Sequence, residues 1–109
     1  MGKVTFDSYI IDPLMRDLVG HERKPSAFIV FLHLWARTNG TRTRALSASL
    51  QEIAGDTGLS KTAVQAGLKL LKRRRLIRSE RASPTAKPTH FVLSPWRRSR
   101  SARRQVSGV

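Results

Sequence analysis

The sequence contains no cysteine, which excludes disulfide bonds, thiolate metal sites and catalysis by a cysteine nucleophile. It also lacks a long hydrophobic run. The longest, Ala27 to Leu32, is too short to cross a bilayer even when it is extended to Ala36. The first 20 residues hold three aspartates and no continuous apolar stretch. We therefore find no secretory signal peptide and expect a cytoplasmic protein with no membrane partner.

Acidic side chains are also scarce, because seven Asp and Glu stand against 21 Lys and Arg, for a net charge of +14. Residues 1–24 carry four charges of each sign, whereas residues 61–90 carry nine basic side chains and one acidic side chain. Five more arginines follow Trp96. A neutral front half and a basic back half predict a surface for a polyanion such as nucleic acid. A basic protein without a specific partner is the alternative interpretation.

With 109 residues, 39% of them hydrophobic, the chain suits one folded domain with a modest core. The strongest predicted helix begins at Pro25 and ends at Asn39-Gly40. It is apolar nearly all round, which is typical of a central, covered helix. A buried strand is the competing interpretation of this segment, because Ile, Val and Phe favour strands. Before it, Asp12 as cap and Gly20 as stop predict a short helix.

Two further helices are predicted from their caps. The tetrapeptide from Ser49 to Glu52 has the form of a capping box, and the helix that it starts should end near Gly58. Ser60 is the expected cap of the next helix, whose apolar side chains recur on one face at i, i+4 and i+7. Short strands are expected near residues 44–48, 76–82 and 89–94, the last two joined by a proline-containing loop as an antiparallel hairpin.

The stretch SLQEIAGDTGLSKTAVQAGLKLLKRRRLI, residues 49–77, resembles the winged helix-turn-helix family of DNA-binding domains. Ala54 stands where the two helices of the motif cross, Gly58 lies in the turn, and Leu59 plugs the core. The resemblance implies a mainly α fold with a small antiparallel β-wing. We therefore assign the winged helix-turn-helix domain to residues 25–95. The residues outside it predict an N-terminal arm and short helix in 1–24 and, because apolar periodicity is lacking, a basic, disordered tail in 96–109.

In this family the second helix of the motif, here about residues 60–74, enters the major groove. Gln65 could then pair with adenine, and Thr62 or Ala66 could meet a thymine methyl group. An ordinary solvated helix face is the alternative. The side chains predicted to contact DNA from this helix, the wing and the tail are Ser60, Lys61, Thr62, Gln65, Ala66, Lys69, Lys72, Arg73, Arg74, Arg78, Arg81, Lys87, Arg97 and Arg98.

The wing is expected to contact the DNA backbone rather than to read bases, because Lys87 is the only basic residue in its loop. Arg78, Arg81 and His90 are the other members of the predicted basic wing. Arg75 departs from the family pattern, which usually places glycine there to leave the helix in a left-handed conformation. Arginine in that conformation costs roughly 1 kcal/mol relative to glycine.

These patterns predict sequence-specific binding of double-stranded DNA by a bacterial or phage transcription regulator at the nucleoid. The alternatives are a replication-initiation or partition protein of a plasmid or phage, an RNA- or ribosome-associated basic protein, and a winged helix that binds a protein. We expect no enzyme, cofactor or metal, because the three histidines lack metal-ligand spacing and no glycine-rich phosphate loop occurs. A homodimer is compatible with the apolar arm from Val4 to Ile11, which could equally pack on its own subunit.

Overall fold

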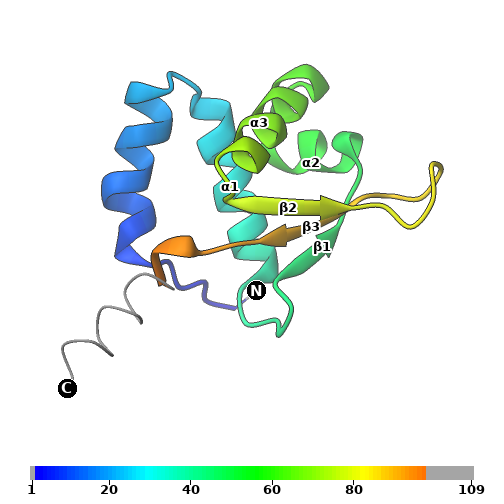
Figure 1. The fold of residues 1–109 in the computed structure, drawn as a ribbon, viewed down its shortest axis with the longest axis horizontal. Helices are drawn as coiled ribbons and strands as arrows, with labels where there is room; N and C mark the ends of the chain where they lie inside the picture. Colours follow the sequence, from blue (N-terminus) through cyan, green and yellow to red (C-terminus); the bar gives the residue numbers. More distant parts are fainter. Residues whose placement is uncertain (1, 98–109) are drawn as a thin grey trace.

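After an N-terminal helical segment, the chain forms one helix, one strand, two helices and a two-stranded hairpin, in that order (Figure 1). This computed structural model describes residues 2–97. This order is that of a winged helix, so the predicted fold class is confirmed. The elements are α1 (Pro25–Thr38), β1 (Ala45–Ser47), α2 (Leu50–Thr57), α3 (Lys61–Arg73), β2 (Ile77–Glu80) and β3 (Thr89–Val92).

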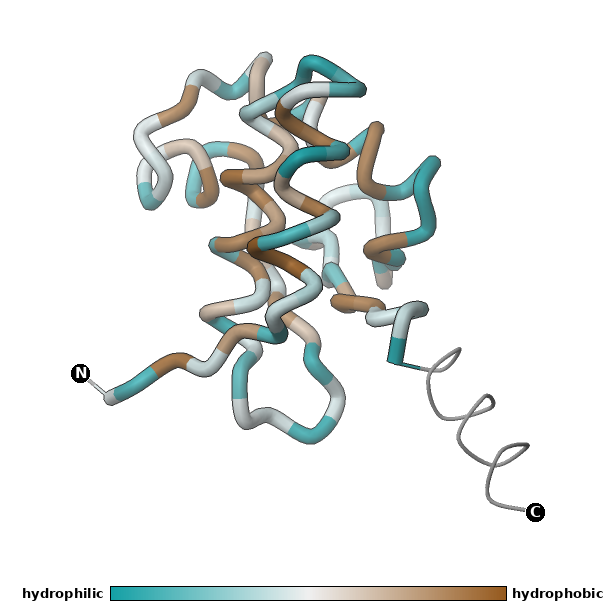
Figure 2. The backbone as a smooth tube through the Cα atoms, turned by 90° about the vertical axis from the view of Figure 1, so that its left-hand side faces the viewer, coloured by the Kyte–Doolittle hydropathy of each residue, from teal (hydrophilic) through white to brown (hydrophobic). Residues whose placement is uncertain are grey.

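The central helix of the domain is α1, which begins at Pro25 as predicted and is not the alternative strand. Phe31, Leu34 and Trp35 are fully or almost fully buried in it. The chain leaves the helix at Asn39 in an extended conformation and turns at Gly40, whose φ is +84°. Figure 2 shows hydrophobic and hydrophilic segments alternating along the helices, as expected where each buries one side. Within residues 2–97, none of the helices combines the length and the apolar character needed to span a bilayer.

Both caps of the helix-turn-helix motif are present. The hydroxyl of Ser49 accepts from the backbone N–H of Glu52 at 3.1 Å, and the Glu52 carboxylate accepts from the Ser49 N–H at 2.9 Å. Gly58 ends α2 in the left-handed region with φ +82°, and Ser60 caps α3 by accepting from the Ala63 N–H at 3.1 Å. The predicted apolar face of α3 is buried: Val64, Leu68 and Leu71.

Gly67 is the residue at which α3 crosses α1. A Cβ atom on Gly67 would lie 3.1 Å from the Cα atom of Ala27 and 3.4 Å from the carbonyl oxygen of Ser26. Both of those atoms belong to the backbone, so a side chain here would push the two helices apart. This glycine therefore holds the first turn of α1 directly against the middle of α3, a contact that the sequence did not predict.

The sheet is antiparallel, with β3 between β1 and β2. The hairpin of β2 and β3 was predicted, whereas the pairing of β1 with β3 was not. Val92 of β3 is buried on the face that packs toward the helices. Phe91 faces the other way and is only partly buried, with the Arg78 guanidinium 4.0 Å above its ring. Phe91 is therefore not a core residue, because its strand position alternates with the buried ones.

The N-terminal helical segment is longer than predicted and contains two π-helical stretches, η1 (Ile10–Leu14) and η2 (Arg16–His21). Asp12 does not cap it but pairs with Arg16 at 3.0 Å, and Gly20 does not stop it. Burial decides its extent, because a stripe at intervals of four residues packs on the core: Ile10, Leu14 and Leu18. The boundaries predicted from Asp12 and Gly20 were therefore wrong.

The ordered domain continues through Trp96 and Arg97, where the sequence predicted the start of a disordered tail. Trp96 is 8% exposed, and its ring stacks on that of Tyr9 at a centroid distance of 4.7 Å. Its indole N–H donates to Asp7 at 2.9 Å, and Arg97 forms two hydrogen bonds with the same carboxylate. The predicted boundary at residue 96 is corrected accordingly. The rest of the predicted tail lies outside the described residues.

The end of α3 shows which backbone conformation Arg75 adopts. Arg75 has φ +58°, its backbone N–H donates to the Lys72 carbonyl at 3.0 Å, and the Leu76 N–H donates to the Leu71 carbonyl at 2.9 Å. These two bonds form a Schellman motif, with Arg75 at the position that glycine usually occupies. The helix thus ends by the left-handed route, and arginine bears its conformational cost.

Replacing Arg75 with glycine is expected to raise the free energy of unfolding by about 0.5–1 kcal/mol, because glycine adopts the left-handed conformation without strain. Urea denaturation followed by circular dichroism measures this change. Arg75→Ala is the matched control, because it removes the same side chain but keeps the strain. If glycine destabilises the domain as much as alanine does, the side chain of Arg75 stabilises the fold and outweighs its backbone.

Candidate nucleic-acid interface

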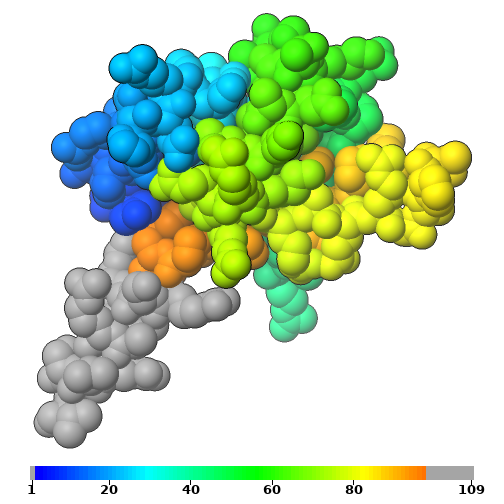
Figure 3. Space-filling view, turned by 45° about the horizontal axis from the view of Figure 1, so that its top comes forward, coloured from blue at the N-terminus to red at the C-terminus, as the bar shows by residue number. Residues whose placement is uncertain are grey.

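The exposed face of α3 runs along the surface between the N-terminal helix and the wing (Figure 3). This face is opposite the apolar face that packs on α1 and α2. Ala66 is half-buried, and the other predicted reading residues of this helix are exposed: Lys61, Thr62, Gln65 and Lys69. The structure thus brings the polar side chains of α3 onto one accessible surface.

One flank of α3 faces the wing across a half-open cleft with a volume of about 310 Å³. Gln65, Lys72 and Arg81 line it, and His90 lines it from the sheet. His90 is 3% exposed, and its Nδ1 atom lies 2.7 Å from the Ser79 hydroxyl. Burial lowers the pKa of His90, and the charges of Lys72 and Arg81 lower it further, against a raising contribution from the backbone of Ala48. His90 is therefore a buried neutral side chain and not the exposed basic wing residue that was predicted.

The other flank of α3 faces the turn between η2 and α1. A groove of about 260 Å³ separates them, lined by Glu22 and Lys24 from the turn and by Ala66, Lys69 and Arg73 from α3. Lys24 directly precedes α1. The exposed helix therefore has a basic boundary on each side, of which the sequence predicted only the wing.

Three of the predicted wing contacts differ in whether an acidic side chain already pairs with them. Arg78 lies on the outer sheet face, above Phe91, and forms an ion pair with Glu80. Lys87 forms an ion pair with Glu52 of α2 at 3.0 Å, and together with the Ser49 backbone it lowers the pKa of Glu52. Arg81 donates to the carbonyl of Pro84 at 3.2 Å and has no acidic partner among residues 2–97. Of these three wing residues, Arg81 alone therefore offers a charge without an acidic partner in residues 2–97.

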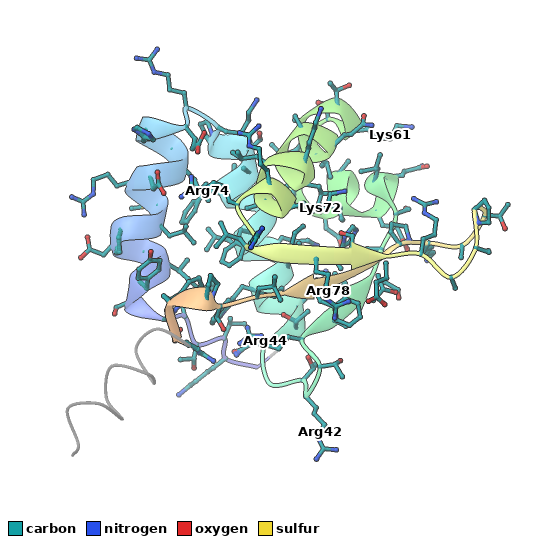
Figure 4. All side chains as sticks on the ribbon, viewed as in Figure 1. Arg42, Arg44, Lys61, Lys72, Arg74 and Arg78 are labelled. Carbon is teal, nitrogen blue, oxygen red and sulfur yellow. The ribbon has the colours of Figure 1, made fainter. Side chains whose placement is uncertain are left out.

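The helix itself carries cations that no carboxylate within residues 2–97 neutralises: Lys61, Lys69 and Lys72. Figure 4 shows Lys61 and Lys72 toward opposite ends of α3. Arg73 is 67% exposed and stands 3.9 Å from Glu22, at the limit of an ion pair. Exposed charges of this kind are free to meet an anion without first losing a strong partner.

Arg74 differs from its neighbours. Its guanidinium donates to Asp17 and, at 2.6 Å, to Glu22, and all three side chains are about a third exposed or less. The hydrogen bond that Arg74 donates to Asp17 raises the pKa of Arg74, and the one to Glu22 adds to it. Both terminal nitrogens of Arg74 thus bind carboxylates and join α3 to the N-terminal helical segment, and its contact with DNA stays a prediction.

Another predicted contact is already engaged within the fold. Arg97 donates two hydrogen bonds to Asp7, and its contact with DNA stays a prediction. Arg98 lies outside the described residues. The hydroxyl of Ser60 caps α3 by accepting from the Ala63 N–H, and the backbone N–H of Ser60 lies at the start of the helix.

No group of three or more potential metal ligands occurs in the part of the chain that the structure describes. His33 stands 3.6 Å from Asp56, at the edge of the core between α1 and α2. Burial lowers the pKa of His33 in spite of that carboxylate. His33 is thus a neutral side chain at the rim of the core, which agrees with the interpretation of its apolar surroundings.

A winged helix with an exposed basic α3 has the architecture of a DNA-binding domain of the helix-turn-helix class. Residues 24–77 match the family model described as a helix-turn-helix domain. The match runs from the residue before α1 to the start of β2. No curated protein and no solved structure matches the chain. A helix-turn-helix domain in this position indicates DNA binding.

Proposed function

We propose that the protein binds double-stranded DNA at specific sequences and regulates transcription, with α3 in the major groove. The observation that carries this proposal is the composition of the exposed face of α3. It combines cations without acidic partners in residues 2–97 with Gln65, whose amide can both donate and accept. Binding alone performs this function, without a catalytic step, and it would place the protein at the nucleoid.

Each exposed side chain of α3 then has a role. Gln65 pairs with an adenine through both atoms of its amide, and Thr62 or Ala66 contacts a thymine methyl group. Lys69, Lys72 and Arg73 bind phosphates, and Lys61 with the first backbone N–H groups of α3 binds another. Arg81 lines the cleft between the wing and α3, and it adds a phosphate contact from the wing.

Selection of bound molecules from a random duplex pool, with a folded RNA pool beside it, tests this function. We expect enrichment of one duplex sequence and none of RNA. Gln65→Ala should relax the base preference at one position, because it removes a base contact worth about 1–3 kcal/mol. Lys69→Ala is the matched control, and it should weaken all sequences alike. Equal weakening of all sequences by Gln65→Ala, or enrichment of RNA alone, would contradict the proposal.

We also propose that two copies pair through residues 2–24. Six large hydrophobic side chains are exposed in residues 2–97, and five of them lie in this N-terminal stretch: Val4, Phe6, Ile11, Met15 and Val19. Residues 1–24 carry no net charge, whereas the whole chain carries +14. Two copies therefore repel each other least where these segments meet. Sedimentation equilibrium should give a dimer that Ile11→Glu dissociates, and a monomer at all concentrations would contradict this.

A further inference from the structure

A major groove is bounded by two phosphate backbones, one on each side of an inserted helix. The wing can reach only one of them, because it lies along one flank of α3 (Figure 3). We propose that Lys24, in the turn between η2 and α1, forms with Lys69 and Arg73 a second phosphate site on the flank opposite the wing. This inference rests on the proposed function and assigns the contact to the other DNA strand.

The position of Lys24 follows from the glycine at the helix crossing. Because Gly67 has no Cβ atom, the backbone of Ala27 lies directly against α3. Lys24 precedes Ala27 by less than one helical turn, and its carbonyl accepts from the Ala27 N–H at 3.0 Å. This places Lys24 on the groove that Ala66, Lys69 and Arg73 line from α3. Cations from two elements thus converge on one groove about 260 Å³ in volume.

The turn is held at both of its ends, so Lys24 is positioned before DNA arrives. The Lys24 N–H donates to the Leu18 carbonyl at 2.9 Å, and the Glu22 N–H donates to the Asp17 carbonyl at 2.8 Å. The guanidinium of Arg74 joins both of these acidic side chains to the end of α3. A site on a rigid support loses less entropy when it binds, which favours a contact here.

The charge of the groove is positive in spite of Glu22. Glu22 is the single acid that lines it, and its carboxylate already receives Arg74 at 2.6 Å. Lys24 and Lys69 have no acidic partner within residues 2–97, and Arg73 stands 3.9 Å from Glu22. An approaching phosphate therefore meets free cations beside a neutralised carboxylate.

The test measures duplex affinity of the full chain carrying Lys24→Ala, with Lys24→Arg and Arg42→Ala as matched variants. Arg42 is an exposed cation at the opposite end of the molecule from α3 (Figure 4). We expect Lys24→Ala to weaken binding about five- to tenfold near 0.1 M salt and to reduce the salt slope by about 0.9, as loss of one phosphate contact does. Lys24→Arg should restore most of the affinity, and Arg42→Ala should keep the wild-type slope.

Duplexes with single neutral methylphosphonates then locate the contact. We expect one substitution that weakens the wild type and not Lys24→Ala, on the opposite strand from the substitution to which Arg81→Ala becomes insensitive. If Lys24→Ala binds as Arg42→Ala does, or if both contacts fall on one strand, the inference is wrong while DNA binding stands. If the wild type shows no salt-dependent duplex binding, the proposed function itself fails.

Discussion

Replacing Trp96 with alanine lowers the free energy of unfolding by about 3–5 kcal/mol, as expected for loss of a buried tryptophan. Its ring stacks on Tyr9, and its centroid lies 6.0 Å from that of Trp35 and 6.3 Å from that of Phe31. It thereby closes an aromatic cluster between the N-terminal segment, α1 and residues 95–97. Its indole N–H also satisfies one oxygen of Asp7. Urea denaturation followed by circular dichroism measures the loss.

Trp96→Phe is the matched control for this experiment. It keeps an aromatic ring in the cluster but loses the hydrogen bond to Asp7, so we expect a smaller loss of about 1–2 kcal/mol. A change of less than about 0.5 kcal/mol for Trp96→Ala is typical of exposed sites. That result would place Trp96 in a tail, as the sequence predicted, and would remove the aromatic cluster from the account of the fold.

Replacing Arg74 with alanine lowers the free energy of unfolding by about 2 kcal/mol, because Asp17 and Glu22 then face each other without their shared cation. The expected value is below that of a fully buried pair, since these side chains keep partial contact with water. The same urea titration measures it.

Arg73→Ala is the control for this second prediction, because Arg73 precedes Arg74 and has the same charge. Its side chain is 67% exposed, so we expect a loss of stability below about 0.5 kcal/mol. Its effect should fall on DNA instead, as about a fivefold loss of affinity for every duplex. Equal loss of stability in the two variants would mean that the basic run is one solvated face.

Local signals predicted the helices well. The capping box at Ser49, the glycine at position 58 and the cap at Ser60 each depend on neighbours within a few residues, and each forms as expected. The pairing of β1 with β3 was not predictable in this way. Its register joins Leu46 to His90, and a strand of three residues carries no local signal for a partner so far along the chain.

At the site, too, the contacts that the sequence did not predict join residues that lie far apart along the chain. The run from Lys72 to Arg75 gives no local reason to separate its members. Within residues 2–97, however, Arg74 alone among them donates hydrogen bonds to carboxylates, which lie more than 50 residues earlier. The net charge of residues 1–24 is zero, so the charge distribution did not indicate Lys24 as a DNA contact. Two of the acids that produce this zero, Asp17 and Glu22, are turned to Arg74. The sequence did hold one signal that places Lys24 at the start of a helix, because it directly precedes Pro25, where α1 begins.

At position 75 the chain departs from the family pattern, because arginine stands where the family usually has glycine. That glycine is usually left-handed, and the observed φ of +58° shows that Arg75 adopts the same conformation. Arg75 is exposed and has no acidic partner among residues 2–97. Its side chain is therefore free beside the cations of α3, while its backbone has the conformation that glycine would adopt at lower cost.

The central claim is that α3 and its two flanks bind the phosphates of a DNA duplex, and the salt dependence of duplex affinity tests it most directly. Six cations surround the exposed face of α3: Lys24, Lys61, Lys69, Lys72, Arg73 and Arg81. We expect the logarithm of the association constant to fall against the logarithm of salt concentration with a slope of about −4 to −6, at about 0.9 per phosphate. A slope near zero, or no duplex binding at low salt, would contradict the account.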